Sequence, residues 1–277
     1  MFNTLDGYIR LVKTNTVQVN THEESSIRIN RVGDSLERYV KDGFCNILDK
    51  DLDDNKRQES YNEIFSYTGT QNQPPDLMIK AGDAIEVKKF KSLNPREIQL
   101  NSSPPRVKLS SKDPMLSERA RNCENWNQKD VVYCLGSVIN GIIKELWFVY
   151  GNCFVSSSNI YKELKNSVKE TLESGSYNMS PTNELGRINN VDPLGYSSFR
   201  IRNMWLLKHP KRMFVDYTNQ NSSGFYLIVR NEKYDTFDQK TIEELKLTKE
   251  ITTQDITVED PDNPSETIEC KILKYEF

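Results

Sequence analysis

The stretch that decides the fold, residues 75–88, reads Pro-Asp-Leu-Met-Ile-Lys-Ala-Gly-Asp-Ala-Ile-Glu-Val-Lys. Short runs of alternating polarity on either side of Ala-Gly-Asp are typical of a β-hairpin. Strand side chains point alternately to opposite faces, so Asp76, Glu86 and Lys88 are expected on one face. With the turn centred on Gly82, Lys88 should lie opposite Asp76. The sequence therefore predicts two carboxylates and an ammonium on one small patch of sheet.

This trio suits metal-assisted hydrolysis of a phosphodiester. Mg²⁺ prefers oxygen ligands and keeps several waters, so two carboxylates and a substrate phosphate suffice to hold it. The ion polarises the phosphoryl oxygen, and Lys88 would orient or help to deprotonate the attacking water and offset the charge on the phosphate. Pro75-Asp76, nine further residues, and Glu86-Val87-Lys88 resemble the PD-(D/E)xK nuclease motif. The alternative is a surface hairpin whose Glu86 and Lys88 are merely solvated.

Length and composition restrict the classes of protein to which the chain can belong. With 277 residues, 28% of them charged, it can bury a sizeable core in one large domain or two small ones. No stretch approaches the roughly 18 apolar residues of a membrane helix, and the first residues lack the layout of a secretion signal. Five cysteines without a CxxC pair suit a reducing cytoplasm. Two histidines make no HExxH motif and no Cys/His zinc set, which leaves carboxylates to carry any metal.

The formal net charge of −3 hides an uneven distribution of charge. Residues 232–277 hold 13 acids and six bases, which leaves 31 bases against 27 acids in residues 1–231. Nine bases and three acids lie between residues 88 and 121, and a second basic cluster lies between residues 187 and 212. Such clusters favour a polyanionic partner, although each alone is also typical of a solvated loop.

An amphipathic helix is expected at residues 31–44, just before the hairpin. Its apolar residues recur at helical spacing, and Glu37 lies on the flank of that apolar stripe. Glu37 could simply pair with Lys41 four residues later, a contact worth roughly a few tenths of a kcal/mol. In the nuclease superfamily that the motif resembles, however, the helix before the hairpin often presents a glutamate to the metal. Glu37 is therefore a candidate for the same site.

The middle of the chain alternates buried elements with polar connections. Asn140-Gly141 between two apolar runs predicts a buried hairpin. Residues 94–114 carry Pro, Ser and Lys without periodicity, and long loops of this kind are usually functional. Residues 159–172 read as an amphipathic helix. Its expected core positions are Ile160, Leu164, Val168 and Leu172.

A strand is expected at residues 199–207, with apolar residues on one side and Arg200 and Arg202 on the other. Two arginines spaced in this way can enter a major groove and bind guanine O6 and N7. The alternative is that both form cross-strand salt bridges on a solvated face.

The order of helix, hairpin, helix, further strands and helix predicts an α/β fold, with one mixed central β-sheet flanked by helices and added C-terminal strands. The chain shows no repeats or long linkers, so we expect a single domain over residues 1–277. A catalytic core would span about residues 30–210, followed by a C-terminal elaboration at about residues 211–277.

Several runs resemble the NgoPII-like family of type II restriction endonucleases. They are Gly-Asp-Ser-Leu-Glu-Arg-Tyr-Val-Lys from Gly33, Gly-Asp-Ala-Ile-Glu-Val-Lys-Lys from Gly82, Thr-Asn-Glu-Leu-Gly-Arg at 182–187, and Phe-Arg-Ile-Arg-Asn-Met-Trp at 199–205. They occur in the order that the family uses. The resemblance implies a restriction-endonuclease-like PD-(D/E)xK core and a Mg²⁺-dependent enzyme that cuts both strands of double-stranded DNA at a short palindrome.

The resemblance carries further implications. The family cuts within GGCC, and hydrolysis should leave 5′-phosphate and 3′-hydroxyl ends. Cutting a palindrome implies a homodimer with one active site for each strand. A DNA methyltransferase that protects the host's own sites is implied as the genetic partner.

The same resemblance assigns roles to individual residues. Asp76 and Glu86 would hold the metal, with the Val87 carbonyl as a candidate further ligand. Lys88 would handle the water, and Glu37 would complete the site. Arg200 and Arg202 are favoured for base reading. The expected DNA contacts are Lys89, Ser103, Arg106, Lys108, Asn183, Arg187, Arg200 and Arg202.

Three hypotheses remain at this point. The leading one is a restriction endonuclease. A repair or junction nuclease of the same superfamily would recognise DNA structure rather than sequence. A DNA-binding protein with an inactive hairpin belongs to a different class, and it would bind DNA without cutting it.

Overall fold

The computed structural model describes residues 1–19, 30–70, 73–101, 103–156, 158–175, 177, 179–182, 184–219 and 222–277. Of residues 30–34 and 158 it describes the backbone alone. The helices are α1 (Thr4–Thr14), α2 (Asn30–Phe44), α3 (Asp54–Ile64), α4 (Glu118–Arg121), α5 (Ser158–Glu173), α6 (Pro210–Met213), α7 (Asn231–Tyr234) and α8 (Gln239–Leu247), with 3₁₀ turns at Gly151–Cys153 and Val215–Tyr217.

The strands follow the chain from the first helices to the C-terminus. They are β1 (Phe65–Thr70), β2 (Gln73–Ile79), β3 (Ala84–Phe90), β4 (Glu97–Asn101), β5 (Lys108–Ser110), β6 (Gln128–Ile139), β7 (Ile142–Tyr150), β8 (Gly186–Asn189), β9 (Ser198–Ile201), β10 (Met204–Lys208), β11 (Gly224–Arg230), β12 (Thr252–Asp260) and β13 (Asn263–Glu276).

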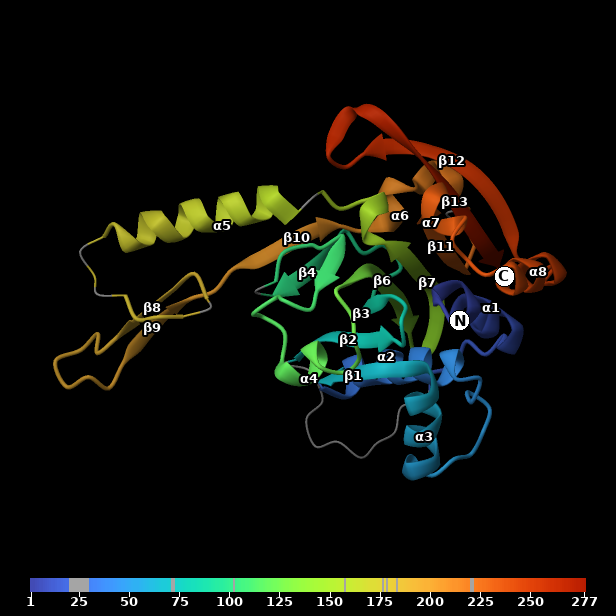
Figure 1. Cartoon of the computed structure of the whole chain (residues 1–277), viewed down its shortest axis with the longest axis horizontal. Coiled ribbons are helices and arrows are strands. Elements are labelled where there is room, and N and C mark those ends of the chain that lie inside the picture. Colours follow the sequence, from blue (N-terminus) through green and yellow to red (C-terminus); the bar gives the residue numbers. More distant parts are fainter. Residues whose placement is uncertain are drawn as a thin grey trace.

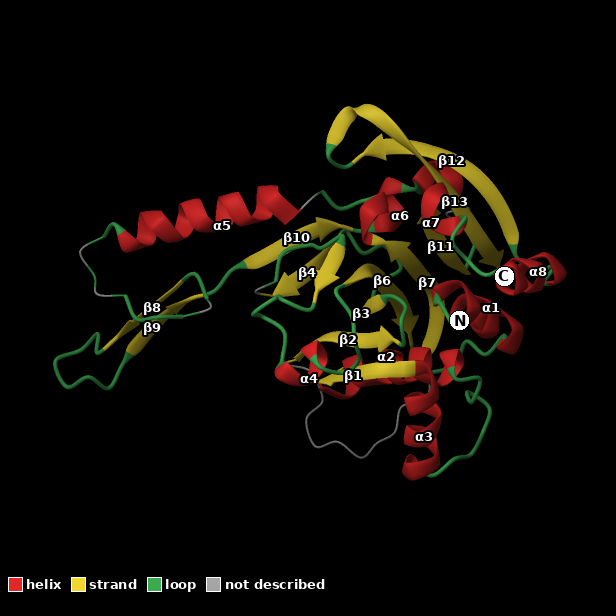
Figure 2. Cartoon of the chain, viewed as in Figure 1, coloured by secondary structure: helices red, strands yellow, loops and turns green. Residues whose placement is uncertain are grey.

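One mixed sheet dominates the structure (Figure 1). In the part of the chain that is described, it has nine strands in the order β1-β2-β3-β6-β7-β11-β13-β12, with β5 also paired to β6. The β3–β6 and β7–β11 pairs are parallel, whereas the hairpin pairs are antiparallel. Helices flank the sheet, and β11 to β13 extend it (Figure 2). The predicted α/β class with added C-terminal strands is confirmed.

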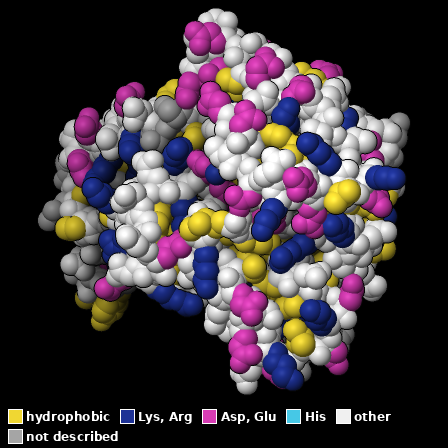
Figure 3. Space-filling model, turned by 45° about the vertical axis from the view of Figure 1, so that its right-hand side comes forward, with side chains coloured by type: hydrophobic (Ala, Val, Ile, Leu, Met, Phe, Trp, Pro, Cys, Tyr) yellow, Lys and Arg dark blue, Asp and Glu magenta, His cyan; other side chains and the backbone are white. Residues whose placement is uncertain are grey.

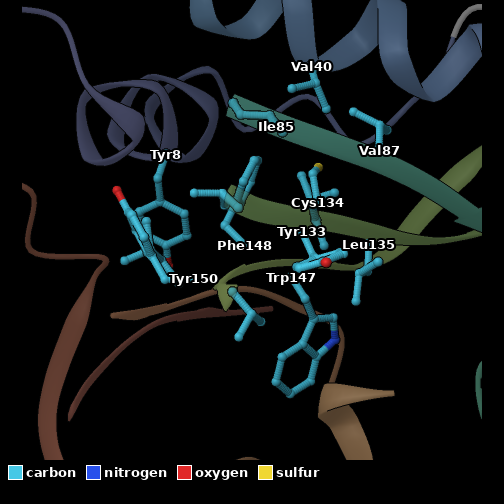
Figure 4. Close-up of a cluster of buried hydrophobic side chains, with 14 of the residues drawn as sticks. Tyr8, Val40, Ile85, Val87, Tyr133, Cys134, Leu135, Trp147, Phe148 and Tyr150 are labelled. Atoms are coloured by element: carbon cyan, nitrogen blue, oxygen red, sulfur yellow. The ribbon is translucent and has the colours of Figure 1, made fainter. Parts of the chain in front are cut away.

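The central strands β3, β6 and β7 bury side chains on both faces. Figure 4 shows Ile85 and Val87 of β3 facing Val40 of α2, and all three side chains are buried. Gly136 of β6 lets this helix lie close to the sheet, because a Cβ atom there would come within 2.6 Å of the Leu36 side chain. The predicted β6–β7 hairpin is also confirmed, and its turn residues Asn140 and Gly141 have φ values of 51° and 77°.

The turn of the β2–β3 hairpin is anchored by a buried carboxylate. Asp83 accepts hydrogen bonds from the hydroxyls of Thr4 in α1 and Tyr150 in β7, both at 2.7 Å. Lys233 of α7 donates to Asp83 at 3.0 Å and to Asp130 at 2.8 Å. Buried charges are costly unless they are paired and hydrogen-bonded. Asp83 therefore ties the hairpin to α1, β7 and α7.

The predicted hairpin exists, but its register was wrong by two residues. Met78 pairs with Ala84 and Leu77 pairs with Ile85, so Lys88 does not lie opposite Asp76. The turn centres on Ala81, with φ of 50°, and the Ile79 N–H donates to the Asp83 carbonyl. A slip of one residue would reverse the faces, but a slip of two preserves them.

Two other predictions were wrong because distant partners decide the structure. The expected loop at 94–114 contains β4, which pairs with β10 more than 100 residues later. The expected strand at 199–207 divides into β9 and β10, because β9 pairs with β8 and β10 pairs with β4.

The helix predicted at 159–172 is present as α5, but its expected core positions are wrong. Ile160, Leu164 and Val168 are 57%, 56% and 39% exposed. The helix projects from the body of the molecule beside the β8–β9 hairpin (Figure 1). These apolar side chains do recur at helical spacing, but no other residue in the described part of the chain covers them.

No helix in the described ranges combines the length and the apolar character needed to cross a bilayer.

His209 is fully buried just before α6. Its Nδ1 accepts a hydrogen bond from the Lys211 N–H at 3.1 Å, and its ring packs edge-on against Phe90 and Trp147. Burial, followed by the positive charges of Lys211 and Arg212, lowers the pKa of His209 to about 3 from an ordinary 6.5.

We expect His209 to make the fold acid-sensitive. Below pH 6.5 the unfolded chain binds a proton that the native histidine does not accept until about pH 3, so stability is lost as pH falls through this window. Each pH unit costs about 1.4 kcal/mol, or about 2 kcal/mol between pH 7 and pH 5. Urea unfolding at both pH values measures the loss. His209→Asn, which keeps a side-chain acceptor, should reduce it, and an unchanged slope in that variant would contradict the assignment.

Candidate active site

The ladder between β2 and β3 ends at Leu77, the residue that directly follows the predicted acid Asp76. Their ladder consists of the Leu77–Ile85 and Met78–Ala84 pairs. Beyond it, the Val87 N–H donates to Asp76 Oδ2 at 2.6 Å instead of to a backbone carbonyl. The N–H and C=O groups of one strand residue project toward the same neighbour, so the Val87 carbonyl faces the same opening. The hairpin thus ends in a gap lined by a carboxylate and free strand edge.

Asp76, Glu86 and Lys88 converge at this gap, as the alternation of the strands predicts. Lys88 Nζ lies 2.7 Å from Glu86 Oε1 and 4.0 Å from Asp76 Oδ2. The three side chains are partly buried, so their charges are less screened by water than those of a surface pair. The expectation of a merely solvated hairpin does not match this geometry.

The two carboxylates of Asp76 and Glu86 outnumber the single ammonium of Lys88, so the group carries an excess of negative charge. Burial, followed by the charge of Glu86, raises the pKa of Asp76 to about 7. Burial disfavours the charged form of Lys88, but the attraction of Glu86, Asp76 and Glu37 outweighs it and raises the pKa of the lysine. One ammonium therefore faces two carboxylates that repel each other. A divalent cation suits such a donor set, because it neutralises both carboxylates.

Glu37 of α2 lies beside this trio. It pairs with Lys41 at 3.0 Å, as the alternative interpretation of its position expected. Its charge also acts on Asp76 and on Lys88. Among the side chains that the structure describes, no three Asp, Glu, His or Cys residues converge closely enough to form a metal cluster by themselves. Asp76 and Glu86 are thus the close pair, with Glu37 farther out.

A cleft of about 480 Å³ opens over the trio. Its floor includes Tyr133 of β6, which is level with Glu86 in the parallel β3–β6 ladder. Strand β4 supplies Gln99 to Asn101, and Glu184 and Arg202 also line the cleft. Residues from distant parts of the sequence therefore line the cleft together with the carboxylates.

Three of the predicted DNA contacts line this cleft: Ser103, Arg106 and Arg202. The Arg106 guanidinium pairs with Asp113, and its backbone N–H donates to the Tyr133 hydroxyl at 2.7 Å. Arg106 is therefore held in place at the wall. The long loop predicted at 94–114 supplies part of the cleft even though it contains two strands.

The other predicted contacts lie elsewhere. Lys89 Nζ donates to Ser35 of α2 at 2.7 Å, on the side of β3 away from the cleft. Lys108 lies 3.6 Å from Asp130, and Arg187 Nε donates to Asn189 at 3.0 Å. Asn183 lies outside the described residues. On the face drawn in Figure 3, basic and acidic side chains are interspersed, so this face carries no continuous basic surface.

Glu184 is the residue that the sequence interpretation missed. Its carboxylate binds Arg200 through two hydrogen bonds, at 2.7 and 2.9 Å, and Arg202 through one at 2.7 Å. Glu184 and Arg202 both line the cleft. The arginines do form salt bridges, but with an acid that precedes β8 rather than across a ladder. The only signal was the position of Glu184 inside the Thr-Asn-Glu-Leu-Gly-Arg run at 182–187.

A second ion pair, between the buried Lys129 and the partly buried Glu124, fixes the turn of the hairpin. Lys129 of β6 donates to the carbonyls of Ile79 and Gly82, both at 2.8 Å, and pairs with Glu124. Glu124 accepts a hydrogen bond from the Ala81 N–H at 2.8 Å. The pair therefore satisfies backbone groups on both sides of the turn.

Comparison with known proteins gives a consistent result along the chain. The family model described as NgoPII restriction endonuclease matches residues 2–259. A curated relative, the type II restriction enzyme NgoPII of Neisseria gonorrhoeae, is 35% identical over 282 residues, which cover 99% of this chain and 99% of the relative. No solved structure matches the chain.

We expect Lys129→Met to destabilise the protein by about 3 kcal/mol, because it leaves Glu124 and two backbone carbonyls without their partner. Denaturant unfolding measures the loss. Glu124→Gln should cost much less in the Lys129→Met background than in the parent protein. If the two losses simply add, the pair does not hold the turn in the way described.

Proposed function

The chain belongs to the NgoPII restriction endonuclease family and is a type II site-specific deoxyribonuclease, and from that premise we propose that Asp76, Glu86 and Lys88 form the centre that cuts DNA. The observation that carries the proposal is the convergence of these three side chains in a cleft lined by Ser103 and Arg202. Family membership decides among the three hypotheses in favour of the restriction endonuclease.

The proposed chemistry is hydrolysis of one phosphodiester in each strand. A scissile phosphate in the cleft would lie beside the Lys88 ammonium, which offsets the negative charge that develops on its oxygens. Lys88 would also hold the attacking water by hydrogen bonding. Glu86 keeps the ammonium in place through its 2.7 Å contact, and the Val87 N–H keeps Asp76 in place at 2.6 Å. Products with 5′-phosphate and 3′-hydroxyl ends are expected.

Type II restriction endonucleases generally need a divalent metal ion, and we propose Mg²⁺ for this chain. The donor set fits, because Asp76 and Glu86 are hard oxygen ligands whose charges Lys88 only partly balances. The Val87 carbonyl and Glu37 are the candidate additional ligands. When bound, Mg²⁺ would supply Lewis-acid polarisation of the phosphoryl oxygen.

The proposed substrate is a short palindrome in double-stranded DNA, with GGCC suggested by the family resemblance. Arg106, Ser103 and Arg202 would contact DNA within the cleft, and Arg200 beside it. Lys108 and Arg187 stay predictions for DNA farther from the cleft, and Asn183 stays a prediction outside the described residues. Lys89 is not carried into the proposal, because it faces α2.

The proposed setting follows from the same premise. We propose that residues 1–277 form one nuclease domain, since β11 to β13 of the C-terminal elaboration belong to the same sheet as β3. The five cysteines are free thiols, as expected of a protein in a reducing cytoplasm. A DNA methyltransferase would protect the host's own sites.

A homodimer is proposed because a palindrome presents one scissile bond in each strand. The exposed stripe of α5 (Ile160, Leu164 and Val168) supports this proposal. A helix with an apolar stripe normally covers it with other apolar groups, and DNA backbone would not do so. We propose that a second copy of the chain covers this stripe.

Plasmid digestion tests the proposed centre. In Mg²⁺ the parent protein should give discrete fragments, and sequencing of their ends should give the palindrome and the cut position. Lys88→Ala should cut about 10²- to 10³-fold more slowly while still binding DNA, because one charge that stabilises the transition state is lost. Lys246→Ala, an exposed lysine of α8, is the control. Equal cutting rates for parent and Lys88→Ala would contradict the assignment.

The dimer surface is tested by Leu164→Glu. Sedimentation should show the parent as a dimer and the variant with a dissociation constant raised about 10-fold or more, because unpaired carboxylates would enter an apolar contact. Asn166→Glu, an exposed change on the opposite side of α5, should leave the dimer intact. Two variants that sediment alike would argue against this surface.

A further inference from the structure

Glu184 gathers two arginines into one unit at the edge of the cleft. Arg200 contacts it through Nε and Nη2, and Arg202 contacts it through Nε. The Glu184 side chain is 15% exposed, whereas those of Arg200 and Arg202 are 46% and 60% exposed. The carboxylate thus lies beneath the two guanidinium groups, which face outward.

This unit belongs to the same cleft as the proposed catalytic centre. Glu184 and Arg202 line it together with Asp76, Glu86 and Lys88. Arg200 lies on β9, which pairs with β8 in the hairpin that projects beside α5 (Figure 1). A duplex whose phosphate reaches Lys88 would therefore pass next to the two arginines.

The shared carboxylate changes what the arginines can do. Two neighbouring guanidinium groups repel each other, and a carboxylate between them offsets that repulsion while leaving one net positive charge. An arginine held by a bidentate carboxylate also loses the freedom of its long side chain before DNA arrives. Its remaining N–H donors then have a fixed direction, as bidentate recognition of guanine O6 and N7 requires.

We propose that Glu184 is a positioning residue for sequence discrimination, which holds Arg200 and Arg202 in the orientation that reads guanine edges beside the scissile phosphate. The inference rests on the proposed function, since it assumes that DNA is cut in this cleft. It adds a role for an acid that would itself touch neither the phosphate nor the metal.

Two simpler roles lead to different results. If Glu184 served only to hold the β8–β9 hairpin in place, replacing it would lower the free energy of unfolding and slow cutting equally at every DNA sequence. If the carboxylate only occupied the place of a DNA phosphate, its loss would tighten binding to all DNA without changing the preferred site. A positioning role alone predicts a changed sequence preference.

The decisive variant is Glu184→Gln, which keeps the shape of the side chain and removes its charge. Cleavage of a duplex library in Mg²⁺, followed by sequencing of the ends, gives the rate at the preferred site and at each single-base variant of it. We expect the ratio of these rates to fall at least 10-fold in Glu184→Gln, while affinity for non-cognate DNA is kept or increased. Glu184→Asp should restore part of the ratio. Glu266→Gln, an exposed acid of β13, makes the same charge change elsewhere and should leave the ratio unchanged.

A second pair of variants keeps the inference testable if Glu184→Gln folds poorly. Arg200→Lys and Arg202→Lys keep each positive charge and remove the planar fork, so both should lower the same ratio. An unchanged ratio in all these variants, or an equal loss of rate at every sequence, would overturn the inference. A parent protein that yields no discrete fragments would overturn the proposed function instead, so the two failures are distinguishable.

Discussion

The rest of the site depends on the early end of the β2–β3 ladder. A fully paired hairpin would use the Val87 N–H for a backbone bond, but here Asp76 Oδ2 accepts it. This single hydrogen bond holds the acid at the point where the strands separate and leaves space over Glu86 and Lys88. The carboxylates of Asp76 and Glu86 stay close together despite their repulsion, because the strands that carry them are held by contacts elsewhere.

The turn of the hairpin, at the end away from Asp76, is held by several hydrogen bonds. Asp83 is bonded to α1, β7 and α7, and Lys129 satisfies two carbonyls of the turn. Groups that stabilise developing charge are most effective when they need no reorganisation during the reaction. A firmly bonded turn at the other end of the hairpin from Asp76 and Glu86 favours that condition, because it fixes both strands. The arginine unit at Glu184 extends the same principle to the outer part of the cleft.

Local patterns predicted the centre of the site better than its surroundings. Asp76, Glu86 and Lys88 were placed correctly on one face although the register was wrong, because a slip of two residues leaves the faces unchanged. The β6–β7 hairpin followed from Asn140-Gly141. By contrast, β4 depends on a partner more than 100 residues later, and the pairing of Glu184 with two arginines depends on the folded β8–β9 hairpin. The α5 stripe was recognised, but periodicity does not say whether the covering surface belongs to the same chain.

The anchor at Asp83 has a consequence for the order in which the protein can be made. The carboxylate of Asp83 accepts hydrogen bonds from Thr4, Tyr150 and Lys233. A growing polypeptide that has just passed residue 150 already contains every acid and the lysine of the proposed centre, but not the ammonium that neutralises Asp83. The ribosome must therefore release the α7 segment before the turn is complete, so the hairpin gains its full native support only after residue 233 has been synthesised.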